Sequence, residues 1–243
     1  MLVKTPAIFL HSIKYSDSSI IAHVYTRSFG CKSYIASGVH GKRSHTKSNL
    51  FQPLFLLNLE VYHKPNSASL QRMKSAQMAT PLASLPFEIS KSAQALFIGE
   101  LLSKVLHEEE PSEDFFDFLF TAITLLDATN EKVSNFLLVF LFKLTRYLGI
   151  TPQGKRQERD CYFDLMQANF VEKEPMHPHF LDVKASQDFA SLFSAELTQL
   201  HRLSFSNSVR RTLFDALIFY YKVHLEIKTD FKSLAIIREV LEG

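Results

Sequence analysis

Apolar, β-branched and aromatic residues in the first 80 positions gather in short runs that are separated by turn sequences. The segments "AIFLHSI" (7–13) and "IIAHVYT" (20–26) are rich in Ile, Val and aromatic residues, and "YSDSS" between them predicts a turn. A second predicted turn, "RSFG" (27–30), precedes a third strand, "CKSYIAS" (31–37). The chain is therefore expected to begin as a series of short strands.

The clearest alternation of apolar and polar residues follows in "FLLNLEVYHK" (55–64). Its two predicted faces are Leu57, Leu59 and Val61 on one side and Asn58, Glu60 and Tyr62 on the other. A fifth strand is predicted at "ASLQRMKSAQM" (68–78), where the alternation is less regular. Five strands in about 75 residues favour a small closed barrel, because closure removes exposed edges. We expect an OB-fold barrel, and an SH3-like barrel is the alternative.

After Pro81 the apolar residues change to a helical period. A helix is predicted over "ISKSAQALFIGELLSKVLHEEE" (89–110), and Ser112 is expected to cap the next one, "FFDFLFTAITLLDA". Asn130 precedes "EKVSNFLLVFLFKLTRYL", which is apolar nearly all round and ends at Gly149. That composition predicts a helix at the centre of a bundle.

Residues 151–183 show little periodicity, and helices resume at "SQDFASLFSAEL", "SVRRTLFDALIFYYKVHLEI" and "SLAIIREVL". The sequence thus predicts an α+β protein with two domains. Residues 1–80 form a five-stranded OB-fold nucleic-acid-binding barrel, and residues 81–243 form an α-helical bundle with an irregular segment near 151–183.

Charge is distributed unevenly along the chain, although 27 Lys+Arg against 25 Asp+Glu leave a net charge of only +2. Residues 1–80 carry ten basic and two acidic side chains, a net charge of +8, and the remainder carries −6. The 42 residues between Asp17 and Glu60 contain no acid at all. This asymmetry supports two domains and predicts an anionic partner for the first. A basic surface that serves only solubility is the alternative.

Motifs of common enzymes are missing from the sequence. Seven glycines are too few and too badly spaced for a phosphate-binding loop, and no nucleophile elbow, HExxH or CxxC motif occurs. The chain is therefore predicted not to be an enzyme and to need no cofactor. The longest apolar run, "FLLVFLF" (136–142), is far shorter than the roughly 20 residues of a membrane span. Two distant cysteines, Cys31 and Cys161, suggest free thiols and a cytoplasmic protein.

A group of possible metal ligands occurs in "HPHFLD", which contains His177, His179 and Asp182. Structural zinc requires four ligands, usually including Cys, so no metal site is predicted here. A hydrolase that uses these three residues is kept as an alternative.

Nucleic acid is the anion that best matches dispersed cations without carboxylates, because each neutralised phosphate releases a condensed counterion. The predicted DNA contacts are Arg27, Lys32, His40, Lys42, Arg43, Lys47 and Lys64. The aromatic residues interleaved with them are Tyr25, Phe29, Tyr34, Phe51 and Tyr62. Small barrels use such rings to stack unpaired bases, and core packing is the alternative for each ring.

Three N-terminal segments, "AIFLHSIKYSDSSIIAHVYTRSFG", "ASGVHGKRS" and "LFQPLFLLNLEVYHK", together resemble the N-terminal half of the RecO family of bacterial recombination mediators. The segments "IGELLSKVLHEEEP", "FLFKLTRYLGITP" and "YYKVHLEIKTDFKSLAIIREVL" resemble that family's helical region. The resemblance implies a non-catalytic role in DNA repair and recombination. It also implies binding of single- and double-stranded DNA, strand annealing, and action with RecR to help load RecA.

The family resemblance implies two further features of this chain. Many members have a four-cysteine zinc site after "LGITP", but here the region reads "QGKRQERDCYFDLM" with Cys161 alone, so zinc is not expected. Members also contact the acidic, apolar-ended tail of single-stranded-DNA-binding protein. The cations expected to bind such a tail are Lys143, Arg146, Arg210 and Arg211. Internal ion pairs are the alternative role for these cations, and an RNA-binding or translation-associated factor is the alternative function.

Overall fold

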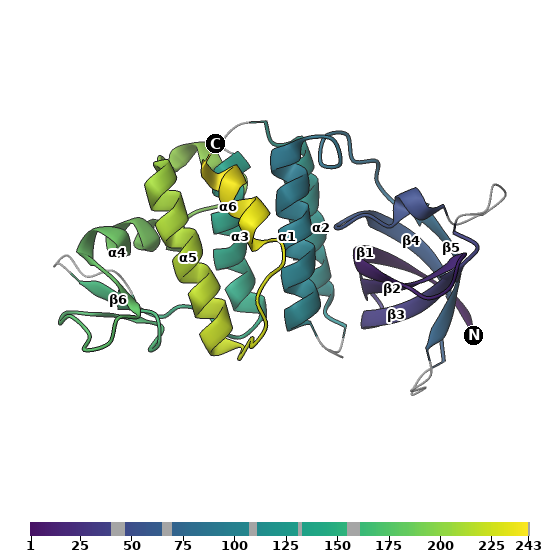
Figure 1. The fold of residues 1–243 in the computed structure, drawn as a ribbon, viewed down its shortest axis with the longest axis horizontal. Coiled ribbons are helices and arrows are strands. Elements are labelled where there is room, and N and C mark those ends of the chain that lie inside the picture. Colours follow the sequence, from purple (N-terminus) through teal and green to yellow (C-terminus); the bar gives the residue numbers. More distant parts are fainter. Residues whose placement is uncertain (40–46, 65–69, 107–110, 131–132, 155–160, 243) are drawn as a thin grey trace. The chain divides into compact units, whose positions relative to one another are not determined.

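The computed structural model describes the chain except for residues 40–46, 65–69, 107–110, 131–132, 155–160 and 243 (Figure 1). The chain forms two compact units, residues 1–128 and 129–243. Among the residues that the structure describes, none of the helices combines the length and apolar character that a membrane span requires.

The first unit begins with a closed five-stranded barrel in the order β1-β2-β3-β5-β4. Its strands are β1 (Leu2–Lys14), β2 (Ser19–Thr26), β3 (Gly30–Ser37), β4 (Leu56–Tyr62) and β5 (Gln71–Met78). All neighbouring strands are antiparallel except β3 and β5, whose parallel pairing joins Tyr34–Ala36 to Gln71–Met73. This is the arrangement of an OB-fold, and the predicted barrel followed by helices is confirmed.

The faces predicted for the fourth strand are also confirmed. Leu57, Leu59 and Val61 are buried inside the barrel, whereas Asn58 and Tyr62 are exposed. The irregular pattern of the fifth strand has a structural cause, a β-bulge. Glu60 pairs with Ser75 and the next residue, Val61, pairs with Met73, so Lys74 is the extra residue on β5.

Helices α1 (Ile89–Val105) and α2 (Glu113–Ala128) pack with the barrel in the first unit. Gly99 lets α1 approach β1 closely, because a Cβ atom there would lie only 3.1 Å from the carbonyl oxygen of Leu10. Ser112 caps α2 as predicted, since its hydroxyl accepts a hydrogen bond from the Phe115 N–H. The change from strands to helices occurs near residue 80, as the sequence predicts. The first compact unit extends further, to residue 128, because α1 and α2 pack with the barrel.

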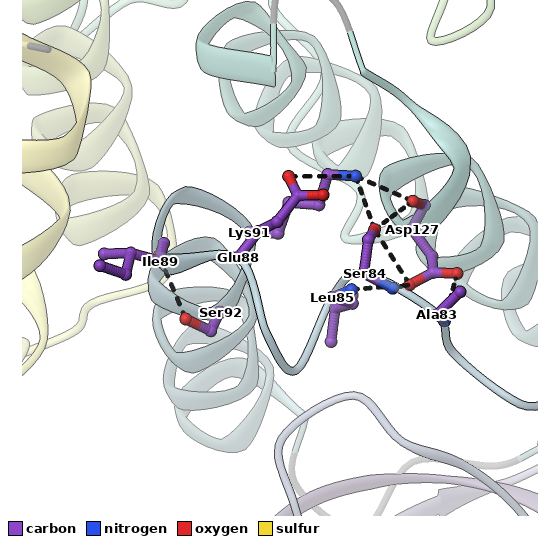
Figure 2. A network of polar contacts seen from close by, with 8 residues as sticks. All are labelled: Ala83, Ser84, Leu85, Glu88, Ile89, Lys91, Ser92 and Asp127. Carbon is purple, nitrogen blue, oxygen red and sulfur yellow. Dashed lines mark hydrogen bonds and ion pairs between the residues drawn. The ribbon is translucent and has the colours of Figure 1, made fainter.

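A buried lysine connects the two helices with the segment before α1 (Figure 2). The Lys91 side chain is fully buried, and its ammonium group donates to the Ser84 hydroxyl at 2.6 Å and to the Asp127 carbonyl at 2.9 Å. Glu88 supplies a carboxylate 3.5 Å away. The burial of a charge is tolerated only with such partners, so these contacts specify how α1 meets the end of α2.

The Asp127 carboxylate completes this network (Figure 2). It accepts hydrogen bonds from the backbone N–H groups of Ala83, Ser84 and Leu85 at 2.9, 2.8 and 2.7 Å. Burial alone would raise the pKa of Asp127, but these donors outweigh it and hold the pKa below its ordinary value. The carboxylate therefore fixes the chain where it passes from the barrel to α1.

The second unit is built around α3 (Val133–Tyr147), which is buried along nearly its whole length as its sequence predicted. Gly149 adopts a positive φ of 71° just after this helix, and the Ile150 N–H bonds to the Thr145 carbonyl at 3.0 Å. The other helices of the unit are α4 (Val183–Ala190), α5 (Asn207–His224) and α6 (Leu234–Glu242). Short 3-10 turns occur at Ser48–Leu50, Ser191–Phe193 and Leu200–Arg202.

Residues 151–183 contain a small sheet rather than only the irregular chain that the sequence predicted. The strands β6 (Tyr162–Asp164), β7 (Asn169–Val171) and β8 (Phe180–Leu181) pair in the order β7-β6-β8. Phe163 is fully buried, with its ring 4.9 Å from Phe170 and 4.5 Å from Phe189. The Asp164 carboxylate accepts from the N–H groups of Met166 and Gln167, which stabilises the turn. Such short strands carry too little pattern to be recognised in the sequence.

Two histidines stack where the barrel meets α1. The rings of His11 and His23 lie 4.2 Å apart at 8°, and each Nδ1 lies 2.8 Å from a hydroxyl, that of Ser103 on α1 and that of Ser33 on β3. Burial lowers the pKa of both rings, and the charge of His23 lowers that of His11 further. Both rings are therefore held neutral in the folded protein at neutral pH.

The Asp127 network predicts a specific loss of stability. Asp127→Ala removes the acceptor of three N–H groups and should lower the free energy of unfolding by about 1–3 kcal/mol. Asp117→Ala on the same helix removes an exposed ion pair with Arg27 and should cost at most about 1 kcal/mol. Denaturant unfolding of both variants measures the difference. Equal losses would show that the buried network adds nothing specific.

The histidine stack predicts a pH dependence of stability. Because the folded pKa values are lowered, the unfolded chain binds more protons below about pH 6.5, and stability must fall as the pH falls through this range. His11→Gln/His23→Gln should lose less stability than wild type between neutral and mildly acidic pH. Urea unfolding at several pH values checks this expectation, which fails if the two proteins show the same slope.

Candidate nucleic-acid interface

Backbone hydrogen bonds hold the described residues on either side of positions 40–46, within the stretch that has no acid. The Val39 N–H donates to the Ser18 carbonyl at 2.9 Å, and the Ser48 N–H donates to the Val39 carbonyl at 3.1 Å. His40, Lys42 and Arg43 lie outside the described residues, so their role in DNA binding stays a prediction. Lys47 is described, and it is exposed beside Ser48–Leu50.

A second group of predicted contacts lies at one end of the barrel. The rings of Phe29 and His63 stack 3.8 Å apart at 14°. Burial lowers the pKa of His63, and the nearby charges of Lys32 and the N-terminal amine lower it further. Lys64 is exposed, and the Gln71 side chain holds its backbone through bonds of 3.2 and 2.9 Å. Lys32 and Lys64 are therefore available on a cationic surface that offers partly exposed rings.

Arg27 faces helix α2 instead. Its guanidinium donates to both oxygens of Asp117, at 2.7 and 3.1 Å, and to Glu113 at 3.2 Å. The hydrogen bond to Glu113 is the main cause that raises the pKa of Arg27, and Asp117 adds to it. Two carboxylates already balance the charge of Arg27, so Arg27 is not part of the proposed DNA interface. The sequence reasoning missed the ion pair because the acids lie about 90 residues away along the chain.

Most of the aromatic residues predicted to stack on bases have structural roles. Tyr25 and Tyr34 are buried, and Tyr25 packs against Phe115 of α2 with ring centroids 5.1 Å apart. Phe51 packs against Phe9 at 5.5 Å. Tyr62 differs, since 48% of it is exposed on the outer face of β4. Core packing thus accounts for the first three rings, and Tyr62 is open to a ligand.

A polar groove of about 360 Å³ lies on the outer face of β1, β4 and β5. Glu60 is one of its lining residues, and its carboxylate lies 3.6 Å from the ammonium group of Lys4 and 3.2 Å from that of Lys74. The Ser75 hydroxyl donates to the same carboxylate at 3.2 Å. The charge count of residues 1–80 included both lysines, but the sequence reasoning did not assign them to a site. The alternation in 55–64 already predicted that Glu60 faces outward, and an outward carboxylate in a basic region is a signal for lysines around it.

The four cations predicted to bind a protein partner have different surroundings. Lys143 pairs with Glu196 at 2.8 Å, while Arg146 and Arg211 are exposed. Arg210 is buried, and its guanidinium donates to the Phe205 carbonyl at 2.8 Å and to Asn207. These hydrogen bonds stabilise the start of α5, and partner binding by Arg210 stays a prediction. The neighbours of Lys143 in the sequence, Phe142 and Leu144, are buried, so they offer no apolar surface beside it.

The candidate metal ligands do not converge on one point. The Asp182 carboxylate caps α4 by accepting from the Ala185 N–H at 2.8 Å. The His177 ring bonds instead to Asp164 at 3.1 Å, and its other nitrogen accepts from the His179 N–H. Cys161 is buried. In the part of the chain that the structure describes, no three His, Cys, Asp or Glu residues are placed to hold a metal ion. These residues do not fit a zinc site.

Comparison with known proteins identifies relatives over the whole length of the chain. The family model described as "Recombination protein O N terminal" matches residues 1–82, and "Recombination protein O C terminal" matches residues 86–235. The chain is 34% identical over 242 residues to "DNA repair protein RecO" of Azobacteroides pseudotrichonymphae, covering 100% of both chains. It is 35% identical over 242 residues to the protein of the same name from Flavobacterium psychrophilum, covering 99% of both. Bacteroides fragilis has a further relative, 33% identical over 243 residues and all of both chains.

Proposed function

Since the chain belongs to the RecO family of DNA repair proteins, we propose that it is a non-catalytic recombination mediator that binds single- and double-stranded DNA and anneals complementary strands. The observation that carries this proposal is the acid-free stretch between Asp17 and Glu60, within a barrel region of net charge +8. Two strands repel each other through their phosphates. A cationic barrel surface reduces this electrostatic repulsion, so the two strands can approach and pair without any chemical step.

The described residues support a surface of several separate cations. Lys47 and Lys64 are exposed, and Lys32 lies near the stacked rings of Phe29 and His63. Phosphate contacts of this kind carry no sequence information, so binding is expected to be independent of base sequence. Such independence suits a mediator that must act on any damaged strand.

We also propose a set of protein partners. The family resemblance implies RecR and the acidic C-terminal tail of single-stranded-DNA-binding protein, with RecA loading as the outcome. Arg146 and Arg211 are exposed in the second unit, and an Arg side chain can hold a terminal carboxylate through two parallel hydrogen bonds. These two arginines are our candidates for the contact with the tail.

Binding to single-stranded DNA should depend steeply on salt. With four to six phosphate contacts, log affinity should fall against log salt with a slope of roughly −3 to −4. Lys42→Glu/Arg43→Glu should weaken binding for all base sequences and reduce that slope by about 1–2. The matched control, Lys14→Glu/Lys228→Glu, changes the charge equally at other positions. Fluorescence anisotropy measures both variants, and equal binding of Lys42→Glu/Arg43→Glu and the control would remove Lys42 and Arg43 from the interface.

An annealing assay tests the proposed activity itself. Complementary oligonucleotides coated with their cognate single-strand-binding protein should anneal faster with the protein than without it. RNA of equal length serves as the competitor, because the alternative RNA-binding factor would prefer it. Failure to accelerate annealing, or a preference for RNA, would contradict the proposal.

The proposed contact with the acidic tail is tested with variants in the second unit. Arg146→Ala should weaken binding of a peptide that copies the acidic tail by roughly tenfold, the effect of losing a charge-assisted hydrogen bond. Lys228→Ala removes an exposed cation elsewhere in the same unit and should bind like wild type. Calorimetry on folded proteins makes the measurement. If Arg146→Ala and wild type bind the peptide with equal affinity, Arg146 is not part of the tail-binding site. Arg211→Ala is then the next variant to measure.

A further inference from the structure

The groove on the outer face of the barrel is lined by polar side chains from three adjacent strands. Cross-strand pairing places Lys4, Glu60 and Ser75 in one row across β1, β4 and β5, and places Pro6, Asn58 and Gln77 in the next row. Asn58 and Gln77 are exposed, so their amide groups are open to a ligand. The volume of about 360 Å³ lies within the range of known small-molecule sites.

The β-bulge on β5 shapes this groove. Because Lys74 is an extra residue, both Lys74 and the following Ser75 reach the Glu60 carboxylate, at 3.2 Å each. Lys4 approaches the same carboxylate from β1 at 3.6 Å. Glu60 therefore holds two ammonium groups, one from β1 and one from β5, and its own charge is more than balanced. Bulges often redirect side chains at functional sites in this way.

The chemistry of this face fits an unpaired nucleic-acid strand. Lys4 is 83% exposed and Lys74 is 48% exposed, so each can contact a phosphate while it remains near Glu60. The amides of Asn58 and Gln77 offer donors and acceptors of the kind that base edges require. Tyr62, two residues beyond Glu60 on β4, adds an exposed ring on which a base can stack.

We propose that the outer face of β1, β4 and β5, with Lys4, Lys74, Asn58, Gln77 and Tyr62, is a second site for single-stranded nucleic acid. This inference rests on the proposed function, and it assigns the second strand of an annealing reaction to residues other than the predicted contacts His40, Lys42, Arg43 and Lys47. Two strands held on one protein molecule are close enough to pair. Each strand needs its own cations, because the phosphates of the first would otherwise repel the second.

A charge-neutral variant tests the site without changing the electrostatics of the barrel. Asn58→Ala/Tyr62→Ala/Gln77→Ala removes three exposed side chains and leaves both lysines in place. Tyr15→Ala/Gln167→Ala is the control, since it removes an exposed tyrosine and an exposed glutamine elsewhere. Native mass spectrometry with non-complementary oligonucleotides of about ten nucleotides counts the strands bound per chain.

The expected result is two strands per chain for wild type and for the control, and one for the groove variant. The affinity of the groove variant for the first strand should stay within about twofold of wild type, whereas its affinity for the second should fall by at least roughly tenfold. Lys4→Gln/Lys74→Gln should also bind a single strand.

Each contrary outcome has one meaning. Two strands on the groove variant, or one strand on wild type, would overturn the second site and leave DNA binding by the chain intact. Wild type that binds no strand at all would overturn the proposed function as well.

Discussion

Closure of the barrel is the constraint on which the rest of the first unit depends. The parallel pairing of β3 with β5, at Tyr34–Ala36 against Gln71–Met73, joins the two strands that hairpin turns alone would leave as edges. Once the barrel is closed, every second residue of each strand must face its interior. Leu57, Leu59 and Val61 then fill the inside, and Asn58, Glu60 and Tyr62 must face outward.

The same closure decides which cations can meet a ligand. The helices that pack on the barrel contribute Glu113 and Asp117, which take up the charge of Arg27. Lys4, Lys47, Lys64 and Lys74 keep exposed positions. The net charge of +8 for residues 1–80 therefore overstates the positive charge that is open to a nucleic acid.

The small sheet of the second unit is held by ring packing and by hydrogen bonds of its turn. Phe163 packs against rings from β7 and α4, and Asp164 satisfies the N–H groups of the following turn. Just before β8, His179 stacks on Phe219 of α5 at 4.3 Å. Each of these contacts is worth little, but together they bury the apolar face of three short strands.

Local patterns in the sequence determined the elements of this protein. The alternation in 55–64, the Ser112 cap, the apolar helix after Asn130 and the stop at Gly149 all depend on neighbours in the chain, and the structure confirms each as a strand, cap, helix or end. The uneven charge was equally visible, because composition needs no coordinates. Tertiary structure decided which of the charged and aromatic residues remain accessible to a ligand. Arg27, Tyr25 and Arg210 looked like ligand contacts, yet each is satisfied by groups that only folding brings near. The groove around Glu60 likewise required the register of three strands and one bulge, and residues so far apart in sequence leave no local signal of their contact.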